Sequence, residues 1–252
     1  MNSTLDAGLI EDAYQEDPAR AASEYGGQFR QDIEGFISQE IVDSCVIPGR
    51  YELPRVPNTV YHAFTDPSGG SSDSFTLAIA HQEGDRVILD CLRERRPPFS
   101  PDQVCAEYAQ ILQSYGLSSV SGDRYAGQWP VEGFAKYGIG YRASELPKND
   151  LYLSMLPMLT TGKAELLDSP RLVIQLCGLE RRTARSGRDS IDHGPHQHDD
   201  ICNSVAGALV AANKQTMIDP GEWEWGSPYE YDPLASPSEL VSDGKFVSLL
   251  DF

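Results

Sequence analysis

Aspartates stand at three places where the surrounding pattern predicts the end of a strand or the start of a helix. Asp66 ends the β-rich run TVYHAFTD and precedes the turn-forming letters PSGG. Asp123 ends the run LSSVSGD, and Asp199 and Asp200 come just before an apolar helical pattern. Carboxylates that converge repel one another unless a cation lies between them, and Mg²⁺ and Mn²⁺ prefer oxygen ligands. The three places therefore predict a divalent metal site if the fold brings them together.

Each aspartate also has an ordinary structural explanation. An aspartate before proline is a common turn former, which would account for Asp66 alone. An acid at a helix start is favoured by the free N–H groups there and by the helix dipole. This capping role accounts for one of Asp199 and Asp200, but not for both.

The elements needed to position these acids follow from the hydrophobic patterns. Residues 59–66, 74–81 and 86–92 read as three strands, and the letters EGD between the last two indicate a hairpin. Residues 101–115 have helical spacing and 117–123 read as a fourth strand. Because a helix precedes it, the fourth strand can return parallel to the first, about 4.8 Å away. Asp66 and Asp123 would then meet at one crevice.

The other elements are expected as follows. A helix begins near Gln128, a strand covers 140–146, and a helix covers 148–159, which Pro157 should kink or end. Residues 171–180 fit either a helix or a buried strand. Tyr25 to Ile41 carries a helical apolar stripe, and a proline-rich linker follows. The predicted fold class is α/β, with a mixed five-stranded sheet (strands 1–3 antiparallel, strands 1, 4 and 5 parallel) flanked by helices.

Composition limits the possible functions. The 252 residues suffice for a sizeable core, and no apolar run reaches the roughly 20 residues of a membrane helix, so a cytoplasmic protein is expected. The five cysteines form no CxxC pair, which argues against a zinc knuckle or a disulfide framework. The formal charge of −18 disfavours nonspecific adhesion to nucleic acid, so DNA binding would require local basic patches.

Three groups of arginines or histidines are candidates for binding phosphate or metal. Arg181, Arg182, Arg185 and Arg188 form a basic loop or hairpin that could contact DNA phosphates or be a solvated charge run. Arg93, Arg95 and Arg96 form a second such cluster. The run HGPHQH, containing His193, His196 and His198, could bind zinc, but His196 or His198 fits a proton relay or phosphate contact better. Asp73 is either a fourth acid of the site or a polar turn residue.

Taken together, the acidic motifs resemble the ribonuclease H-like nucleases, and more narrowly the C-terminal nuclease domain of the phage large terminase subunit. The resemblance spans Thr59 to Asn213 and rests on three stretches, FTDPSGGSSDSFTLAIAH, SVSGDRYAG and HDDICNSVAGAL. SEYGGQFRQDIEGFISQEIV also looks like the end of that family's ATPase domain. The resemblance to the terminase family divides the chain into three regions. Residues 1–53 would be an acidic leader and helical segment with a Pro-rich linker, residues 54–215 the nuclease domain, and residues 216–252 an acidic, aromatic and Pro-rich tail.

The resemblance implies a metal-dependent endonuclease that cuts concatemeric DNA during packaging in a bacterial host cell. Asp66, Asp123 and Asp200 would be catalytic metal ligands, and Asp199 a ligand or helix cap. Two Mg²⁺ or Mn²⁺ ions would be the cofactors. Double-stranded DNA would be the substrate, and a separately encoded ATPase, the small terminase subunit or the portal would be partners.

The chain departs from the family pattern in two ways. It contains no GxxxxGK[ST] phosphate loop, so ATP hydrolysis is not expected of it. Many relatives have a further acid three residues after the one matching Asp200, where this chain has Asn203, which can coordinate through its carbonyl oxygen but brings no charge. Weaker metal affinity or lost activity is the expected consequence. The alternatives are a Holliday-junction resolvase or transposase-like nuclease, and an inactive prophage-derived assembly protein.

Overall fold

A computed structural model describes residues 11, 33–123, 127–183, 189–195 and 197–213. Within these ranges, six strands form one mixed sheet in the order β6-β5-β2-β3-β4-β7. Their bounds are β2 Tyr61–Asp66, β3 Phe75–Glu83, β4 Arg86–Arg95, β5 Ser119–Gly122, β6 Gly140–Ala143 and β7 Ala164–Glu165. Three further short strands form a second sheet in the order β1-β8-β9, namely β1 Ile33–Gly35, β8 Leu179–Thr183 and β9 Asp189–His193.

The topology of the large sheet confirms the predicted fold class. β2, β3 and β4 are antiparallel neighbours, whereas β5 pairs parallel with β2 and β6 pairs parallel with β5. The sixth strand, β7, was not predicted, and it pairs parallel with β4 through two residues only. So short a strand leaves no periodic signal in the sequence.

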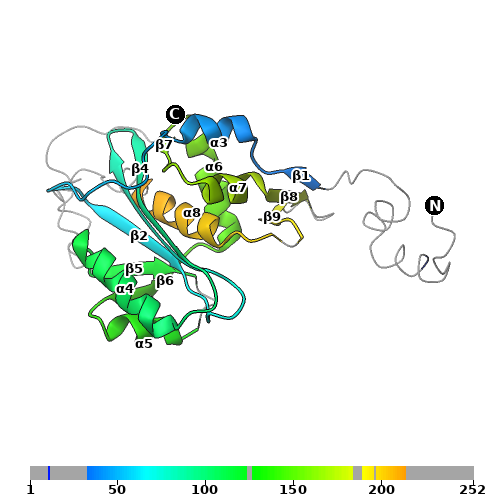
Figure 1. Ribbon diagram of the computed structural model, residues 1–252. Helices are drawn as coiled ribbons and strands as arrows, with labels where there is room; N and C mark the ends of the chain where they lie inside the picture. Colours follow the sequence, from blue (N-terminus) through cyan, green and yellow to red (C-terminus); the bar gives the residue numbers. More distant parts are fainter. Residues whose placement is uncertain (1–10, 12–32, 124–126, 184–188, 196, 214–252) are drawn as a thin grey trace, which may run out of the picture. The chain divides into compact units, whose positions relative to one another are not determined.

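Helices cover both faces of this sheet (Figure 1). α4 (Pro101–Ser114) and α5 (Trp129–Ala135) pack on one face, where their apolar side chains meet Phe75, Leu77 and Ile79 of β3. α8 (Asp200–Asn213) crosses the other face, packed against Ala78 and Ala80 of the same strand. β3 is therefore buried on both sides, which explains its nearly continuous apolar run.

Three more helices complete the α8 face: α3 (Gln39–Cys45), α6 (Lys148–Thr160) and α7 (Pro170–Cys177). α8 is buried along almost its whole length because α6, α7 and the sheet surround it. No helix in the described ranges is long and apolar enough to cross a bilayer.

Two sequence predictions about helices are corrected. The helical stripe predicted from Tyr25 to Ile41 is interrupted, because Ile33–Gly35 forms β1 against β8 and the helix begins only at Gln39. Residues 25–32 lie outside the described part of the chain. Pro157 was predicted to kink or end its helix, and the second of these is excluded: α6 continues to Thr160, since the buried side chains of Met158 and Leu159 hold the last turn in the core. The undecided segment 171–180 is mostly helix, with β8 beginning at its end.

Candidate metal centre

The parallel pairing of β2 with β5 brings the first two acids to one edge of the sheet. Thr65 is in register with Gly122, so Asp66 and Asp123 are the next residues on two adjacent strands. A Cβ at Gly122 would lie 2.7 Å from the Thr65 carbonyl oxygen, so only glycine allows this approach of the strands. Tyr141 Oη then donates a 2.8 Å hydrogen bond to the Asp123 carbonyl oxygen, which holds the end of β5 in place.

The start of α8 is fixed to the same edge of the sheet. Asp200 Oδ2 accepts a 3.0 Å hydrogen bond from the backbone N–H of Ser74, just before β3. Thr76 Oγ1 donates to the Asp200 carbonyl oxygen at 2.8 Å. Because Asp66 pairs with Thr76 across the β2–β3 ladder, Asp200 is held beside the end of β2.

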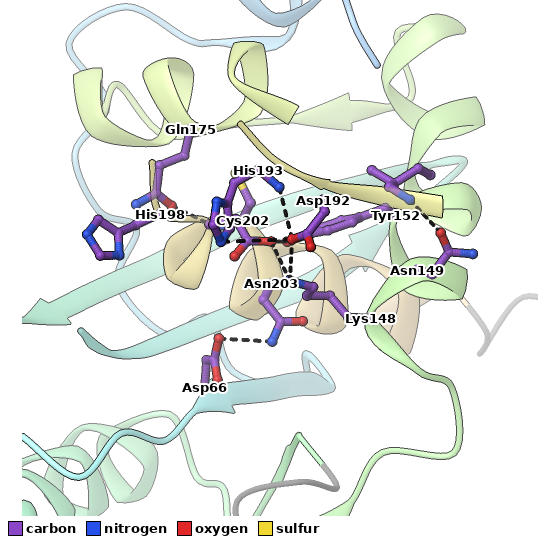
Figure 2. Close-up of polar contacts among 12 residues, drawn as sticks. Asp66, Lys148, Asn149, Tyr152, Gln175, Asp192, His193, His198, Cys202 and Asn203 are labelled. Carbon is purple, nitrogen blue, oxygen red and sulfur yellow. Dashed lines mark hydrogen bonds and ion pairs between the residues drawn. The ribbon is translucent and has the colours of Figure 1, made fainter. Parts of the chain in front are cut away.

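Asn203, one turn into α8, contacts Asp66 directly. Its side-chain amide nitrogen donates a 2.9 Å hydrogen bond to Asp66 Oδ2, as Figure 2 shows. Its side-chain carbonyl oxygen, Asn203 Oδ1, is buried and has no hydrogen-bond partner among the described residues. A buried polar atom without a partner is costly, so this oxygen fits a cation ligand.

The surroundings of Asp66 disfavour its ionised form. Burial raises the pKa of Asp66 from its ordinary value of 3.8 to about 8. The Asn203 hydrogen bond opposes this rise, whereas the nearby negative charges of Asp200, Asp123 and Asp199 add to it. Burial also raises the pKa of Asp200. A divalent cation would offset both the desolvation and the repulsion.

Asp199 is held differently from the other acids. It is buried, and its Oδ2 accepts a 2.7 Å hydrogen bond from Tyr152 Oη and lies 2.9 Å from Lys148 Nζ. The helix-cap role considered for Asp199 is filled by Gln175 instead, whose Oε1 accepts the backbone N–H groups of Ile201 at 2.9 Å and Cys202 at 3.3 Å. α7 thus supplies the cap through a tertiary contact that local sequence could not reveal.

The other predicted site residues divide into three groups. Asp73 and His198 are exposed and lie near Asp200, with 3.8 Å between His198 Nδ1 and Asp73 Oδ1. His193 belongs to a different cluster, with Asp192 and Asp199, so His193 and His198 do not share a zinc site. His196 lies outside the described residues.

The basic segment is partly described. Arg181 and Arg182 are on β8 of a hairpin with β9, as one of the two readings predicted, and Arg182 pairs with Glu180 at 3.0 Å. Arg185 and Arg188 lie outside the described residues. The second cluster is paired with acids: Arg93 with Glu52, Arg95 with Glu107 and Arg96 with Glu94.

Three residues of this region were missed from the sequence. Lys148 and Tyr152 have the i, i+4 spacing of one helix face, which could have grouped them, but nothing local links them to Asp199. Gln175 resembles any polar residue on an amphipathic helix.

Comparison with known proteins agrees with this fold. The sequence matches no protein-family model and no curated protein. Among solved structures, the large terminase nuclease of thermophilic phage G20c superimposes with a TM-score of 0.59 at 18% identity, covering 69% of this chain and 96% of that one. The Thermus phage P74-26 large terminase nuclease domain gives 0.55 at 18% identity, covering 69% and 94%.

A longer relative and metal-bound structures extend the comparison. The HK97 bacteriophage large terminase gives a TM-score of 0.57 at 15% identity, covering 84% of this chain but 52% of that chain. The G20c nuclease has also been solved with bound cobalt, magnesium and zinc. The structural neighbours of this chain are thus large terminase nuclease domains of phages, and its fold is their ribonuclease H-like α/β fold.

Proposed function

We propose that this chain is a metal-dependent endonuclease of the large terminase type, which hydrolyses phosphodiester bonds of double-stranded DNA. The observation that supports this most strongly is Asp66. Burial raises the pKa of this carboxyl to about 8, it lies beside Asp123, and among the described residues its side chain is hydrogen-bonded by the amide of Asn203. Such an acid is expensive to ionise without a cation, and the fold is that of terminase nucleases.

The metal ligands in this proposal are Asp66, Asp123 and Asp200, with Asp199 and the carbonyl oxygen of Asn203 completing the set. The ligand oxygens suit two Mg²⁺ or Mn²⁺ ions, and the G20c nuclease has been solved with magnesium and other divalent metals. When bound, two such ions would supply a reactive water on one side of the phosphodiester and charge stabilisation for the leaving oxygen on the other.

The protein's own residues restrain three of the proposed ligands. Ser74 and Thr76 hold Asp200, Tyr141 holds the backbone at Asp123, and Asn203 holds Asp66. In the proposed hydrolysis, water adds to the scissile phosphorus and the bond to one deoxyribose oxygen breaks; the leaving oxygen takes up a proton, so the products are a phosphate end and a hydroxyl end.

DNA binding and assembly are further parts of this proposal. The segment Arg181 to Arg188, which begins on β8, would contact the DNA phosphates. Residues 54–215 would be the nuclease domain, and a separately encoded terminase ATPase, small subunit or portal would be partners in the cytoplasm of a bacterial host.

Plasmid cleavage tests the proposal. Purified protein with Mn²⁺ or Mg²⁺ should nick and linearise supercoiled plasmid, and EDTA should abolish this. Asp66→Asn should lose cleavage by at least about a hundredfold, because the ligand charge is lost. The matched control is Asp85→Asn, an exposed acid of the β3–β4 turn that should cleave as the parent does.

Two outcomes would overturn it. Absence of cleavage with either metal would favour the inactive assembly protein, to which Asn203 in place of an acid also points. Preferential cutting of four-way junctions over linear duplex would favour the resolvase alternative.

A further inference from the structure

Lys148 connects the candidate ligand Asp199 to the β8–β9 hairpin. It is the first residue of α6, and its Nζ lies 2.9 Å from Asp199 Oδ2 and 3.0 Å from Asp192 Oδ1. Asp192 is on β9, whereas Asp199 directly precedes α8. Figure 2 shows the Lys148 side chain reaching from α6 toward Asp192.

A second donor from the same face of α6 reaches the same oxygen. Tyr152, one helical turn after Lys148, donates a 2.7 Å hydrogen bond to Asp199 Oδ2. Both contacts therefore use one carboxylate oxygen. With Oδ2 held from one side by two donors, the direction of the other oxygen, Oδ1, is fixed as well.

The hairpin does not depend on Lys148 for its attachment to α6. The neighbouring residue Asn149 accepts a 2.8 Å hydrogen bond through Oδ1 from the backbone N–H of Ile191 on β9. The Asp192 side chain is 47% exposed, so its pairing with Lys148 is screened by water. The Asp199 side chain is 9% exposed, and a buried carboxylate requires a paired charge.

The ammonium also sits where a group of possible metal ligands converges. Ligand atoms of Asp192, His193 and Asp199 lie within 4.8 Å of one another, and Lys148 contacts two of the three. The Lys148 ammonium therefore supplies positive charge to this group of acids.

We infer that Lys148 is a positioning residue of the candidate active site. Its ammonium is the resident counter-ion of Asp199, and with Tyr152 it orients that carboxylate for metal binding. This inference rests on the proposed nuclease function, and it adds α6 to the parts of the chain that build the site. A purely structural ion pair that ties the hairpin down is the competing explanation.

Steady-state kinetics separate the two explanations. Lys148→Met removes the charge and keeps most of the stem, and it should lower kcat at saturating Mn²⁺ by at least about tenfold. The KM for duplex DNA should stay within about twofold, because Asp199 and not the DNA loses its partner. Lys148→Arg should restore most of kcat. The control Lys163→Met removes another lysine, paired with exposed Asp85, and should change neither constant.

Two kinetic results would overturn the inference. One is a kcat for Lys148→Met close to that of the parent. The other is a rise in KM alone, which would make Lys148 a DNA contact. If Lys148→Met fails to fold, Tyr152→Phe takes its place, since it removes only the hydroxyl that shares Asp199 Oδ2. The kcat of Tyr152→Phe should also fall, and an unchanged kcat would count against the inference.

A double-mutant cycle in EDTA tests the pairing without any nuclease activity. The thermal midpoints of Lys148→Met, Asp199→Asn and the double variant are compared with the parent. If Lys148 is the counter-ion of Asp199, the double variant loses clearly less than the sum of the two single losses. The same cycle with Asp192→Asn should show weaker coupling. Additive losses at Asp199, or stronger coupling to Asp192, would overturn the inference even if the parent proves to be an active nuclease. If the parent cuts no DNA, the nuclease proposal fails and this cycle still decides the pairing.

Discussion

The side-chain amide of Asn203 donates a 2.9 Å hydrogen bond to Asp66 Oδ2, joining the first turn of α8 to the end of β2. These residues are 137 positions apart in the chain. The bond uses the amide nitrogen and leaves the buried carbonyl oxygen of Asn203 without a partner among the described residues. Asn203 thus restrains the most strongly perturbed acid of the site and offers one oxygen ligand, but it adds no negative charge.

Asn203→Asp should lower the stability of the metal-free protein and raise its affinity for metal. The substitution removes the amide donor to Asp66 and places a second carboxyl group at a buried position, so the metal-free protein should lose about 1–3 kcal/mol of unfolding free energy. Mn²⁺ should bind about tenfold more tightly, because the site gains a charged ligand. Urea unfolding in EDTA and calorimetric Mn²⁺ titration measure the two effects. Asn203→Ala is the control. It removes both the amide donor to Asp66 and the carbonyl oxygen ligand, so both stability and Mn²⁺ affinity should fall. A metal affinity of Asn203→Asp no higher than the parent's would contradict the prediction.

The raised pKa of Asp66 should appear in the pH dependence of stability. The carboxyl holds its proton in the folded state up to about pH 8 but loses it above about 3.8 when exposed. Its contribution to stability is therefore complete below about pH 4 and is lost as the pH rises through 8. The loss is at most about 1.4 kcal/mol per pH unit. Asp66→Asn should lack this loss, so the free-energy difference between parent and variant in EDTA should drift against the parent from pH 4 to 8. A drift in the opposite direction would show that Asp66 is ionised in the folded protein.

Gln175→Ala should destabilise the start of α8. It removes the oxygen that accepts the backbone N–H groups of Ile201 and Cys202, and the cost should be about 1–2 kcal/mol, as for other lost helix caps. Gln175→Glu keeps an acceptor and should lose less. The exposed Gln113→Ala serves as a surface control and should have little effect in urea unfolding. Equal losses for the alanine and glutamate variants would mean that packing, not capping, is the role of Gln175.

Gly207→Ala should separate α8 from β2. A Cβ at this position would overlap the Phe64 ring in the middle of the helix–sheet contact. Overpacking of this kind typically costs about 1–3 kcal/mol of unfolding free energy. Because α8 carries Asn203, metal affinity should fall as well. Gly140→Ala, where the nearest atom to the new Cβ would be 3.7 Å away, is the matched control. A Gly207→Ala protein as stable as the Gly140→Ala protein would refute this account of the contact.

Tyr141→Phe should test the support of Asp123. The substitution removes one hydroxyl, which donates to the Asp123 carbonyl oxygen at 2.8 Å, and leaves the ring stacked on Phe134. Stability should fall by about 0.5–1.5 kcal/mol. The Mn²⁺ concentration for half-maximal cleavage should rise, since the backbone at a ligand is less restrained. Tyr137→Phe removes an exposed hydroxyl that donates to Asp102, away from the site, and should leave the metal requirement unchanged.

Much of the sheet was predictable because its signals are local. The alternating and apolar runs that become β2 to β6 are contiguous, and their turns are marked by glycine, proline and aspartate. The helix between β4 and β5 predicts a parallel return, and this return places Asp66 and Asp123 next to each other. The short strands β1 and β7 carry no such signal, and their pairing partners lie far along the chain.

Residue types and periodicity were enough to identify the candidate metal ligands and the strands that end on them, because both are properties of short stretches of the chain. Three contacts are evident only in the folded chain: Asn203 with Asp66, Gln175 with the start of α8, and Lys148 with Asp199. These contacts join residues from different elements, so they exist only after α6, α7 and α8 have packed on the sheet. The physical reason is that desolvation and charge pairing depend on distances in space, and spacing along the chain does not encode them.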